Sequence, residues 1–214
     1  MLKSRFSRGD TLIEVLFAVS VFSLVAVGTL SIMNQGTASS ERSLETTLVR
    51  QQIDAQADTL RFLHDAYINA YQINANLAED EDAPDASDDE TSPLARWAAL
   101  SEYISADPIE VADMSDGCAT PADGSFAFDP KTTNFTADAE ALIPAETTAK
   151  VSYDSDGVMS AQGLWIQATR HTADASTPDY IDFYIQACWE GPGLSVPMTL
   201  QTIVRLYEPN KDGA

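Results

Sequence analysis

Residues 8–15 read Arg-Gly-Asp-Thr-Leu-Ile-Glu-Val, and this stretch decides how the rest of the chain is interpreted. It joins a short basic leader to an apolar run that extends from about Leu12 to Met33. The run has about the 20 residues that a helix needs to cross a bilayer. A carboxylate near the centre of such a helix costs on the order of 3 kcal/mol, and less toward an end, so Glu14 requires an explanation.

The distribution of charge around the apolar run predicts its orientation. Lys3, Arg5 and Arg8 precede the run, whereas the chain that follows it is acidic. Basic residues beside a spanning helix favour the cytoplasmic side. We therefore expect the short N-terminus to lie in the cytoplasm and the residues beyond about position 40 to be exported.

The composition narrows the classes of protein that the chain can belong to. With 214 residues and 44% hydrophobic content, it is long enough for one globular domain with an N-terminal appendage. It has 12 Lys and Arg against 33 Asp and Glu, which gives a net charge of -21. This charge repels phosphates over most of the surface, so nucleic acid is an unlikely partner.

The pattern that follows the apolar run predicts that its helix continues. Residues 41–71 contain no Gly or Pro, and their apolar side chains recur at three to five positions, as one face of an amphipathic helix requires. A helix from Thr11 to about Asn74 would be ~95 Å long at 1.5 Å per residue. This length exceeds a compact domain of this size, so the first half is expected to protrude.

The remainder of the chain predicts an α+β head. Leu94 to Ile104 reads as a short helix, and residues 105–147 read as loop-rich. Four segments, residues 150–154, 163–170, 180–190 and 199–208, are rich in β-branched and aromatic residues, which predicts an antiparallel sheet. The helix over 44–71 would cover this sheet. Trp165, Phe183 and Tyr184 are then expected in the core or on the sheet surface rather than in a ligand platform.

The stretch from Gly9 to Val15 resembles the processing and assembly signal of type IV prepilins and related pseudopilins. In that signal a short basic leader ends in Gly, and the helix that follows carries Glu at its fifth residue. The resemblance implies that a membrane peptidase cuts between Gly9 and Asp10 and methylates the new amino terminus at Asp10. It is specific over Arg8 to Met33 and extends in general character to about residue 75.

A physical reason for Glu14 accompanies this resemblance. Cleavage would create a cationic α-amino group at Asp10, and Glu14 of one subunit can neutralise that group on a neighbour. A buried pair of opposite charges also fixes the axial register of two helices, because a slip leaves both charges unpaired. Asp10 departs from the family pattern, which most often has Phe or Met there, and the helix lacks the proline of many major pilins.

Two other interpretations of the N-terminus remain open. Glu14 can lie at headgroup depth and simply reach water. The run can also be an ordinary secretory signal cut near one of the small-x-small triplets at 26–28 or 36–38. The run is longer than the usual apolar core of such a signal, and a secretory signal leaves Glu14 unexplained.

The resemblance implies a pilin fold with five parts: a leader (1–9), a transmembrane and filament-core helix (10–38), its amphipathic half (39–76), an acidic loop (77–93) and a globular head (94–214). It implies a structural subunit of a type IV pilus or related filament, for which a minor pilin is favoured. The implied partners are other pilin subunits, the prepilin peptidase, and the pilus assembly machinery of the cytoplasmic membrane. The precursor would reside in that membrane and the mature subunit in an extracellular filament. The alternatives are a secretion-system pseudopilin and a signal-anchored extracellular binding domain that does not polymerise.

The two cysteines, Cys118 and Cys188, are too few and too far apart for a zinc site. One pair suits a single disulfide in an exported domain. The resemblance points the same way, since many pilins join a variable surface region to the sheet by one disulfide. Two buried free thiols are the alternative.

No catalytic set or cofactor motif emerges from the sequence. His64 and His171 are not accompanied by a nucleophile pattern or a glycine-rich phosphate loop, so we expect neither an enzyme nor a cofactor. The acidic segment 77–93 is rich in acids and has two prolines and no base, and it reads as a solvated, disordered loop. A calcium site is the alternative, since clustered carboxylates are suitable ligands, but the segment lacks the glycine and spacing of a calcium loop. Residues 154–157 read as a β-turn rather than as part of a calcium site.

Overall fold

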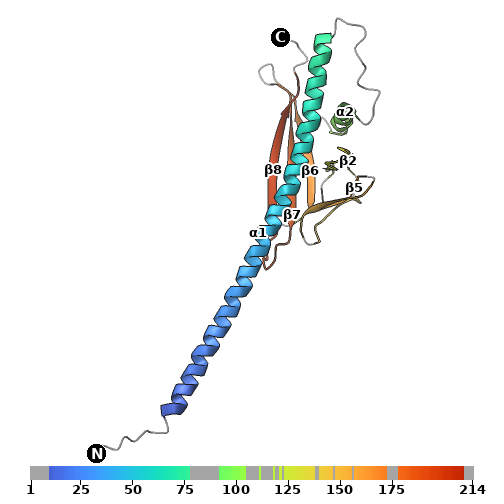
Figure 1. Ribbon diagram of the computed structural model, residues 1–214. Helices are drawn as coiled ribbons and strands as arrows, with labels where there is room; N and C mark the ends of the chain where they lie inside the picture. Colours follow the sequence, from blue (N-terminus) through green and yellow to red (C-terminus); the bar gives the residue numbers. More distant parts are fainter. Residues whose placement is uncertain are drawn as a thin grey trace, which may run out of the picture. The chain divides into compact units, whose positions relative to one another are not determined.

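The computed structural model describes residues 10–77, 92–104, 111, 118, 121, 123–137, 140–146, 148–155, 157–172 and 178–209 (Figure 1). The leader and most of the predicted acidic loop lie outside these residues. The chain divides into two compact units, Met1–Leu44 and Glu45–Ala214. A long N-terminal helix is followed by antiparallel sheets, so the predicted α+β class is confirmed.

Helix α1 extends from Asp10 to Leu77, close to the predicted bounds of 11 and 74. Its first part belongs to the first unit and its remainder, from Glu45, to the second. Within the second unit, α1 buries a stripe of side chains spaced three or four residues apart: Val49, Ile53, Ala57, Leu60 and Leu63. This spacing places them on one face of the helix, which packs against the sheet.

Helix α2 extends from Pro93 to Tyr103, one residue earlier at each end than the predicted segment. Ser92 is its N-cap, and the Ser92 hydroxyl accepts a hydrogen bond from the Ala95 N–H at 3.1 Å. Pro93 follows the cap, where its missing N–H leaves no unpaired donor. Trp97, one turn inside α2, stacks on Tyr67 of α1 with ring centroids 6.0 Å apart. The two helices therefore meet through aromatic side chains.

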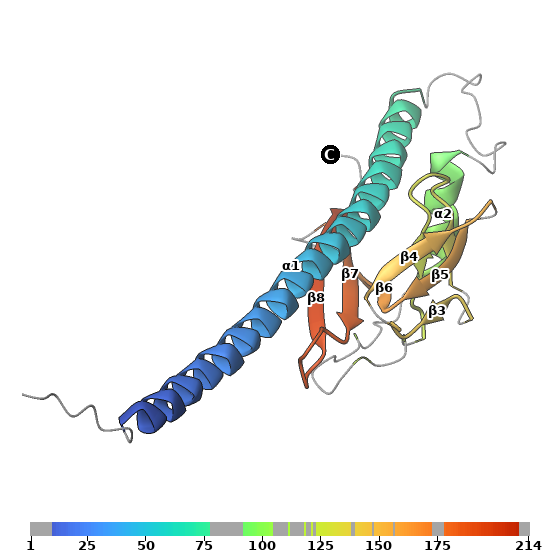
Figure 2. The same ribbon diagram turned by 60° about the horizontal axis from the view of Figure 1, so that its bottom comes forward.

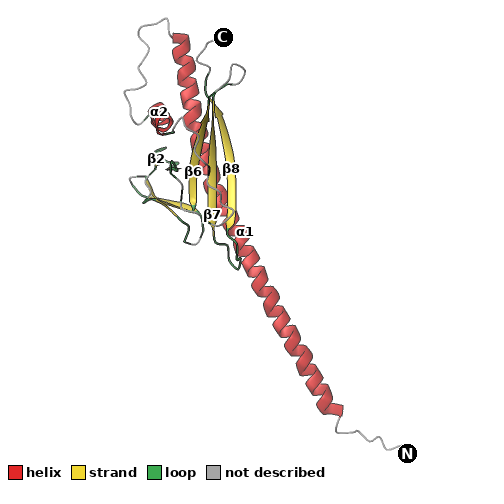
Figure 3. Ribbon diagram, turned by 180° about the vertical axis from the view of Figure 1, so that it is seen from behind, coloured by secondary structure: helices red, strands yellow, loops and turns green. Residues whose placement is uncertain are grey.

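The main sheet consists of β6 (Leu164–His171), β7 (Tyr180–Trp189) and β8 (Met198–Tyr207), in that order. Both pairings are antiparallel, and Figure 3 shows the three strands side by side. One face carries apolar side chains into the core that α1 covers. The other face carries polar and aromatic side chains, including Gln186 and Asp182.

Two smaller sheets are formed by short strands, and Figure 2 shows the one that contains β3, β4 and β5. Strands β1 (Ala127–Phe128) and β2 (Phe135–Thr136) form an antiparallel pair. The third sheet has the order β3–β5–β4 and contains β3 (Leu142–Ile143), β4 (Lys150–Tyr153) and β5 (Val158–Gln162). Its β3–β5 pairing is parallel. The sequence interpretation had neither β5 nor the two-residue strands, and it placed 150–154 in the main sheet.

Gly163 explains why the strand at 150–153 belongs to a different sheet. It lies between β5 and β6 with a φ of +59°, in the left-handed region that favours glycine. Its N–H donates to Ile143 O at 2.7 Å, and its carbonyl accepts the Cys188 N–H at 2.8 Å. A Cβ at this position would collide with Cys188 O and with the Ala145 side chain. The chain turns here from the small sheet into the main one.

Gln56 fastens α1 to the β1 strand. Its Nε2 donates to Phe128 O at 2.8 Å, and its Oε1 accepts the Phe128 N–H at 2.7 Å. Gln56 is fully buried, and Phe128 is also inaccessible to solvent. Because water cannot replace the missing partner, losing this side chain leaves two buried backbone groups unpaired.

We expect Gln56→Ala to lower the free energy of unfolding by about 3 kcal/mol, since each unpaired buried group costs about 1–3 kcal/mol. Gln51→Ala is the matched control: it changes an exposed glutamine on the same helix and should cost less than about 0.5 kcal/mol. Urea unfolding of the detergent-solubilised chain, followed by tryptophan fluorescence, measures both. Equal losses in the two variants would contradict the role given to Gln56.

Candidate functional site

The segment from Leu12 to Met33 is a predominantly apolar surface on the first unit. All its large hydrophobic side chains are exposed, with Leu24 at 75%. They are Leu12, Ile13, Val15, Leu16, Phe17, Val19, Val21, Phe22, Leu24, Val25, Val27, Leu30, Ile32 and Met33. Soluble monomers rarely expose an apolar surface of this extent. Within the described residues, α1 is the one helix that is long and apolar enough to cross a membrane.

Three hydroxyl groups within this segment are paired inside the helix itself. Ser20 Oγ donates to Leu16 O at 2.7 Å, and Ser23 Oγ donates to Val19 O at 2.8 Å. Thr29 Oγ1 donates to Val25 O at 2.8 Å. A helix in lipid must satisfy its polar groups internally, because the surroundings offer no hydrogen-bond partner. These three hydroxyls meet that requirement.

Glu14 is the one charged residue of the segment, and its side chain is exposed. Among the residues that the structure describes, the next base along the helix is Arg42. At 1.5 Å per residue, these two positions are about 42 Å apart along the axis. An ion pair extends over about 4 Å, so Arg42 of the same chain cannot neutralise Glu14. Among the described residues, no base of the same chain therefore lies within reach of Glu14.

The other sequence-predicted positions of the N-terminus are described less completely. Gly9 lies outside the described residues. Asp10 is the first residue of α1, but its side chain is not described. The predicted cleavage site therefore coincides with the start of the described helix, and the cut itself stays a prediction.

Cys118 and Cys188 are joined by a disulfide in the structure. Cys188 is a fully buried residue of β7, on the face of the main sheet opposite the core. Cys118 comes from the region between α2 and β1. The bond therefore ties this region to the main sheet.

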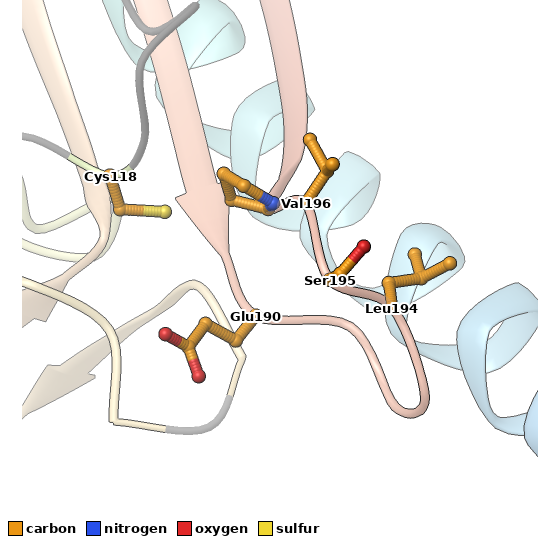
Figure 4. A pocket seen from close by; sticks show the side chains of 6 residues that line it. Cys118, Glu190, Leu194, Ser195 and Val196 are labelled. Atoms are coloured by element: carbon orange, nitrogen blue, oxygen red, sulfur yellow. The ribbon is translucent and has the colours of Figure 1, made fainter.

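Two of the pockets lined by described residues of the second unit bear on function. One, of ≈ 250 Å³, lies between Cys118 and the turn that connects β7 to β8, and Figure 4 shows Glu190 at its edge. The other, of ≈ 420 Å³, is called here the α1 pocket. It lies between α1 and the β1–β2 turn and is lined by Ala55, Asp58, Thr59, Phe62, Pro130, Lys131 and Thr133.

The two histidines take part in separate structural contacts. His64 Nε2 lies 2.9 Å from Tyr207 O at the end of β8, and the His64 ring packs edge-on against Trp97 at 5.1 Å. His171 stacks on Tyr180 at 4.6 Å and lies 3.7 Å from Asp182 Oδ2. His171 pairs with Tyr180 and Tyr180 pairs with Tyr207, so both contacts lie at the same end of the main sheet. Within the part of the chain that the structure describes, no hydrogen bond or ring contact joins the two histidines directly.

Asp182 and Arg205 form an ion pair that the sequence interpretation missed. Arg205 donates from Nε and Nη2 to the two carboxylate oxygens of Asp182, both at 2.7 Å. These hydrogen bonds are the largest cause of a raised pKa for Arg205, so its guanidinium stays charged. The alternation of polar and apolar residues could have placed both side chains on the polar face of neighbouring strands. The register that sets them opposite each other could not be predicted from the sequence.

A scan against protein-family models, a search of curated proteins and a search of solved structures each return no match to this chain.

The disulfide gives a direct test of export. We expect non-reducing tryptic mass spectrometry of the native protein to find the Cys118 peptide linked to the Cys188 peptide. The bond closes a loop with a sequence separation of 70, and on the chain-entropy estimate it contributes about 4 kcal/mol. The double variant Cys118→Ser/Cys188→Ser should accordingly unfold at lower urea. Two freely alkylated thiols in the native protein would contradict the bond.

Proposed function

We propose that this protein is a structural subunit of a type IV pilus or related filament, that it is cut after Gly9, and that it assembles through α1. A minor pilin is the favoured member, and a secretion-system pseudopilin is the nearest alternative. The subunit would begin as a membrane precursor with its N-terminus in the cytoplasm and end in an extracellular filament. Its work is packing and surface display rather than catalysis.

The position of Glu14 is the main observation that supports this proposal. Glu14 is an exposed carboxylate on an apolar helix, about 42 Å along the axis from Arg42. It also lies five residues after Gly9, which is the spacing of the prepilin signal. An amino terminus created at Asp10 of a neighbouring subunit would supply the missing cation. The same contact would set the axial position of the two helices, since a slip separates both charges.

The apolar surface of α1 supports the same proposal. Its side chains from Leu12 to Met33 are exposed in the single chain, and three of its hydroxyls are paired internally. Such a helix suits lipid before assembly and a bundle of like helices afterwards. The second unit would then form the head, with the later part of α1 packed on the main sheet.

A signal-anchored binding domain that does not polymerise is the candidate from a different class. Helix α1 is also long and apolar enough to serve only as an anchor. Shearing separates the two candidates, because filaments release the mature protein into the medium whereas an anchored monomer stays with the membrane.

The processing step makes the first prediction of this proposal. We expect the mature chain to start at Asp10, with an N-methylated amino group, and we expect Gly9→Val to leave the precursor uncut in the membrane. Intact-mass and N-terminal peptide measurements on the purified protein decide this. A mature terminus close to Ser39 would support a secretory signal and exclude the prepilin signal.

The assembly step makes the second prediction. Glu14→Leu should insert and be cleaved normally, because removing a charge does not hinder membrane insertion. It should nevertheless be depleted at least tenfold from sheared filaments, since the neighbour's amino group loses its partner. Glu14→Asp should be intermediate, because it keeps the charge but has a shorter reach. Quantitative immunoblots of membrane and filament fractions measure the three proteins.

Ser20→Ala is the matched control for this series, because it removes a polar group that already bonds within its own helix. It should enter filaments like the wild type. Normal incorporation of Glu14→Leu would show that the charge pair is unnecessary. It would support the alternative that Glu14 is a solvated acid at headgroup depth.

A further inference from the structure

We propose that copies of this chain also contact one another head to tail through their second units, with the β7–β8 turn of one copy docked in the α1 pocket of the next. The β7–β8 turn comprises residues 190–197. This inference rests on the proposed function only in that filament assembly brings copies together. The contact itself involves none of the residues of the Leu12–Met33 segment.

The α1 pocket is built before any partner arrives. One wall is α1 and the other is the β1–β2 turn, and Gln56 fastens the two through Phe128. The turn is itself fixed by Asp129, whose carboxylate accepts hydrogen bonds from the Lys131 N–H and the Thr132 hydroxyl at 2.9 Å each. A pocket held in this way loses little conformational entropy on binding.

The α1 pocket has an apolar centre that is open to solvent. Phe62 is 53% exposed although it lies on the half of α1 that packs into the head. Ala55 and Pro130 extend the apolar lining on either side of it. The volume of ≈ 420 Å³ is large enough to receive one or two aliphatic side chains.

The β7–β8 turn offers side chains of that kind at its tip. Val196 is 65% exposed and Leu194 is 45% exposed. Figure 4 shows Leu194 pointing away from Cys118. The turn is pre-organised, because the Leu194 N–H donates to Gly191 O at 3.2 Å and Gly193 has the positive φ (68°) that this turn requires. The turn therefore presents two exposed aliphatic side chains on a hydrogen-bonded backbone.

Charge selects this pairing among possible contacts between copies. With a net charge of -21, most surfaces of two copies repel each other. The α1 pocket carries Lys131 and also Asp58, whose carboxylate is already paired with Arg61 at 3.0 Å. The β7–β8 turn begins with Glu190. Docking the turn in the pocket brings Glu190 and Lys131 to the same interface.

The positions of the two surfaces along α1 allow copies to stay parallel. The turn lies close to the level of Glu45, since Trp189 Nε1 donates to Glu45 Oε2 at 3.2 Å. The α1 pocket is centred near Asp58, which is about 20 Å further along the helix axis. Moving one copy by that distance along α1 brings its turn level with the pocket of the other. Because the two surfaces differ and each contact advances the next copy by about 20 Å along α1, the contact repeats from copy to copy and does not close into a ring.

Disulfide trapping in full-length chains tests this contact. Asp58→Cys and Val196→Cys chains are co-expressed, oxidised mildly on intact cells and analysed on non-reducing gels with mass spectrometry of the linked peptides. We expect a mixed dimer through positions 58 and 196. The control replaces Asp58→Cys by Asp65→Cys, whose exposed position lies about 10 Å further along α1, beyond disulfide reach. The 58–196 product should exceed the 65–196 product at least tenfold, and equal or absent products overturn the contact.

A charge exchange gives a second, independent readout of the same contact. Lys131→Glu and Glu190→Lys should each reduce the 58–196 product several-fold, and the chain with both changes should recover it. Retention of the Cys118–Cys188 bond in each variant verifies that the head has folded. Failure of the double change to restore the product would contradict the pairing of turn and pocket.

The outcome is separable from that of the proposed function. If sheared filaments form but the 58–196 product does not, the proposed filament stands and this contact is excluded. If the 58–196 product forms but filaments do not, this contact stands and polymerisation through α1 is excluded.

Discussion

One continuous helix has to satisfy two different environments, and the other elements are arranged around that constraint. Before Met33, apolar side chains surround α1 on all sides, so no single packed face can cover them. After Val49, the apolar side chains narrow to one stripe, and a sheet can bury it. The apolar side chains of α1 therefore change from covering the whole circumference of the helix to forming one stripe, and the fold of the second unit begins at this change.

The second unit is held to this helix by a few polar contacts as well as by its core. Gln56 binds the backbone of Phe128, and His64 lies against the carbonyl of Tyr207 at the end of β8. Glu45 accepts the indole N–H of Trp189 at the opposite end of the main sheet. Directional contacts at several levels of α1 prevent the sheet from sliding along an otherwise uniform apolar stripe.

The sequence predicted the long elements well because their signals accumulate over many residues. Helix α1 and the three strands of the main sheet each repeat their pattern often enough to be recognised. Strands β1, β2 and β3 have two residues each, and two residues cannot display a period. The sheet change at Gly163 was also hidden, because it depends on a close approach to Cys188 that only the folded chain creates.

The candidate sites also differ in whether the sequence alone could reveal them. Glu14 stood out in sequence, since a single acid in an apolar run is visible without any knowledge of the fold. The α1 pocket was not visible, because its lining residues come from segments about 70 positions apart. The ion pair of Asp182 and Arg205 depended on strand register in the same way.

The internal pairing of Ser20, Ser23 and Thr29 has a consequence for how selective α1 can be toward neighbouring helices. Hydroxyl protons are the usual means by which helices in lipid recognise each other directionally. Here those protons are already committed to carbonyls of the same helix. Toward any helix beside the segment, these three side chains consequently offer shape without a directional proton. Glu14, the one charged side chain of the segment, is then its main directional group, so a single substitution there would change the polarity of this surface while the apolar side chains stay the same.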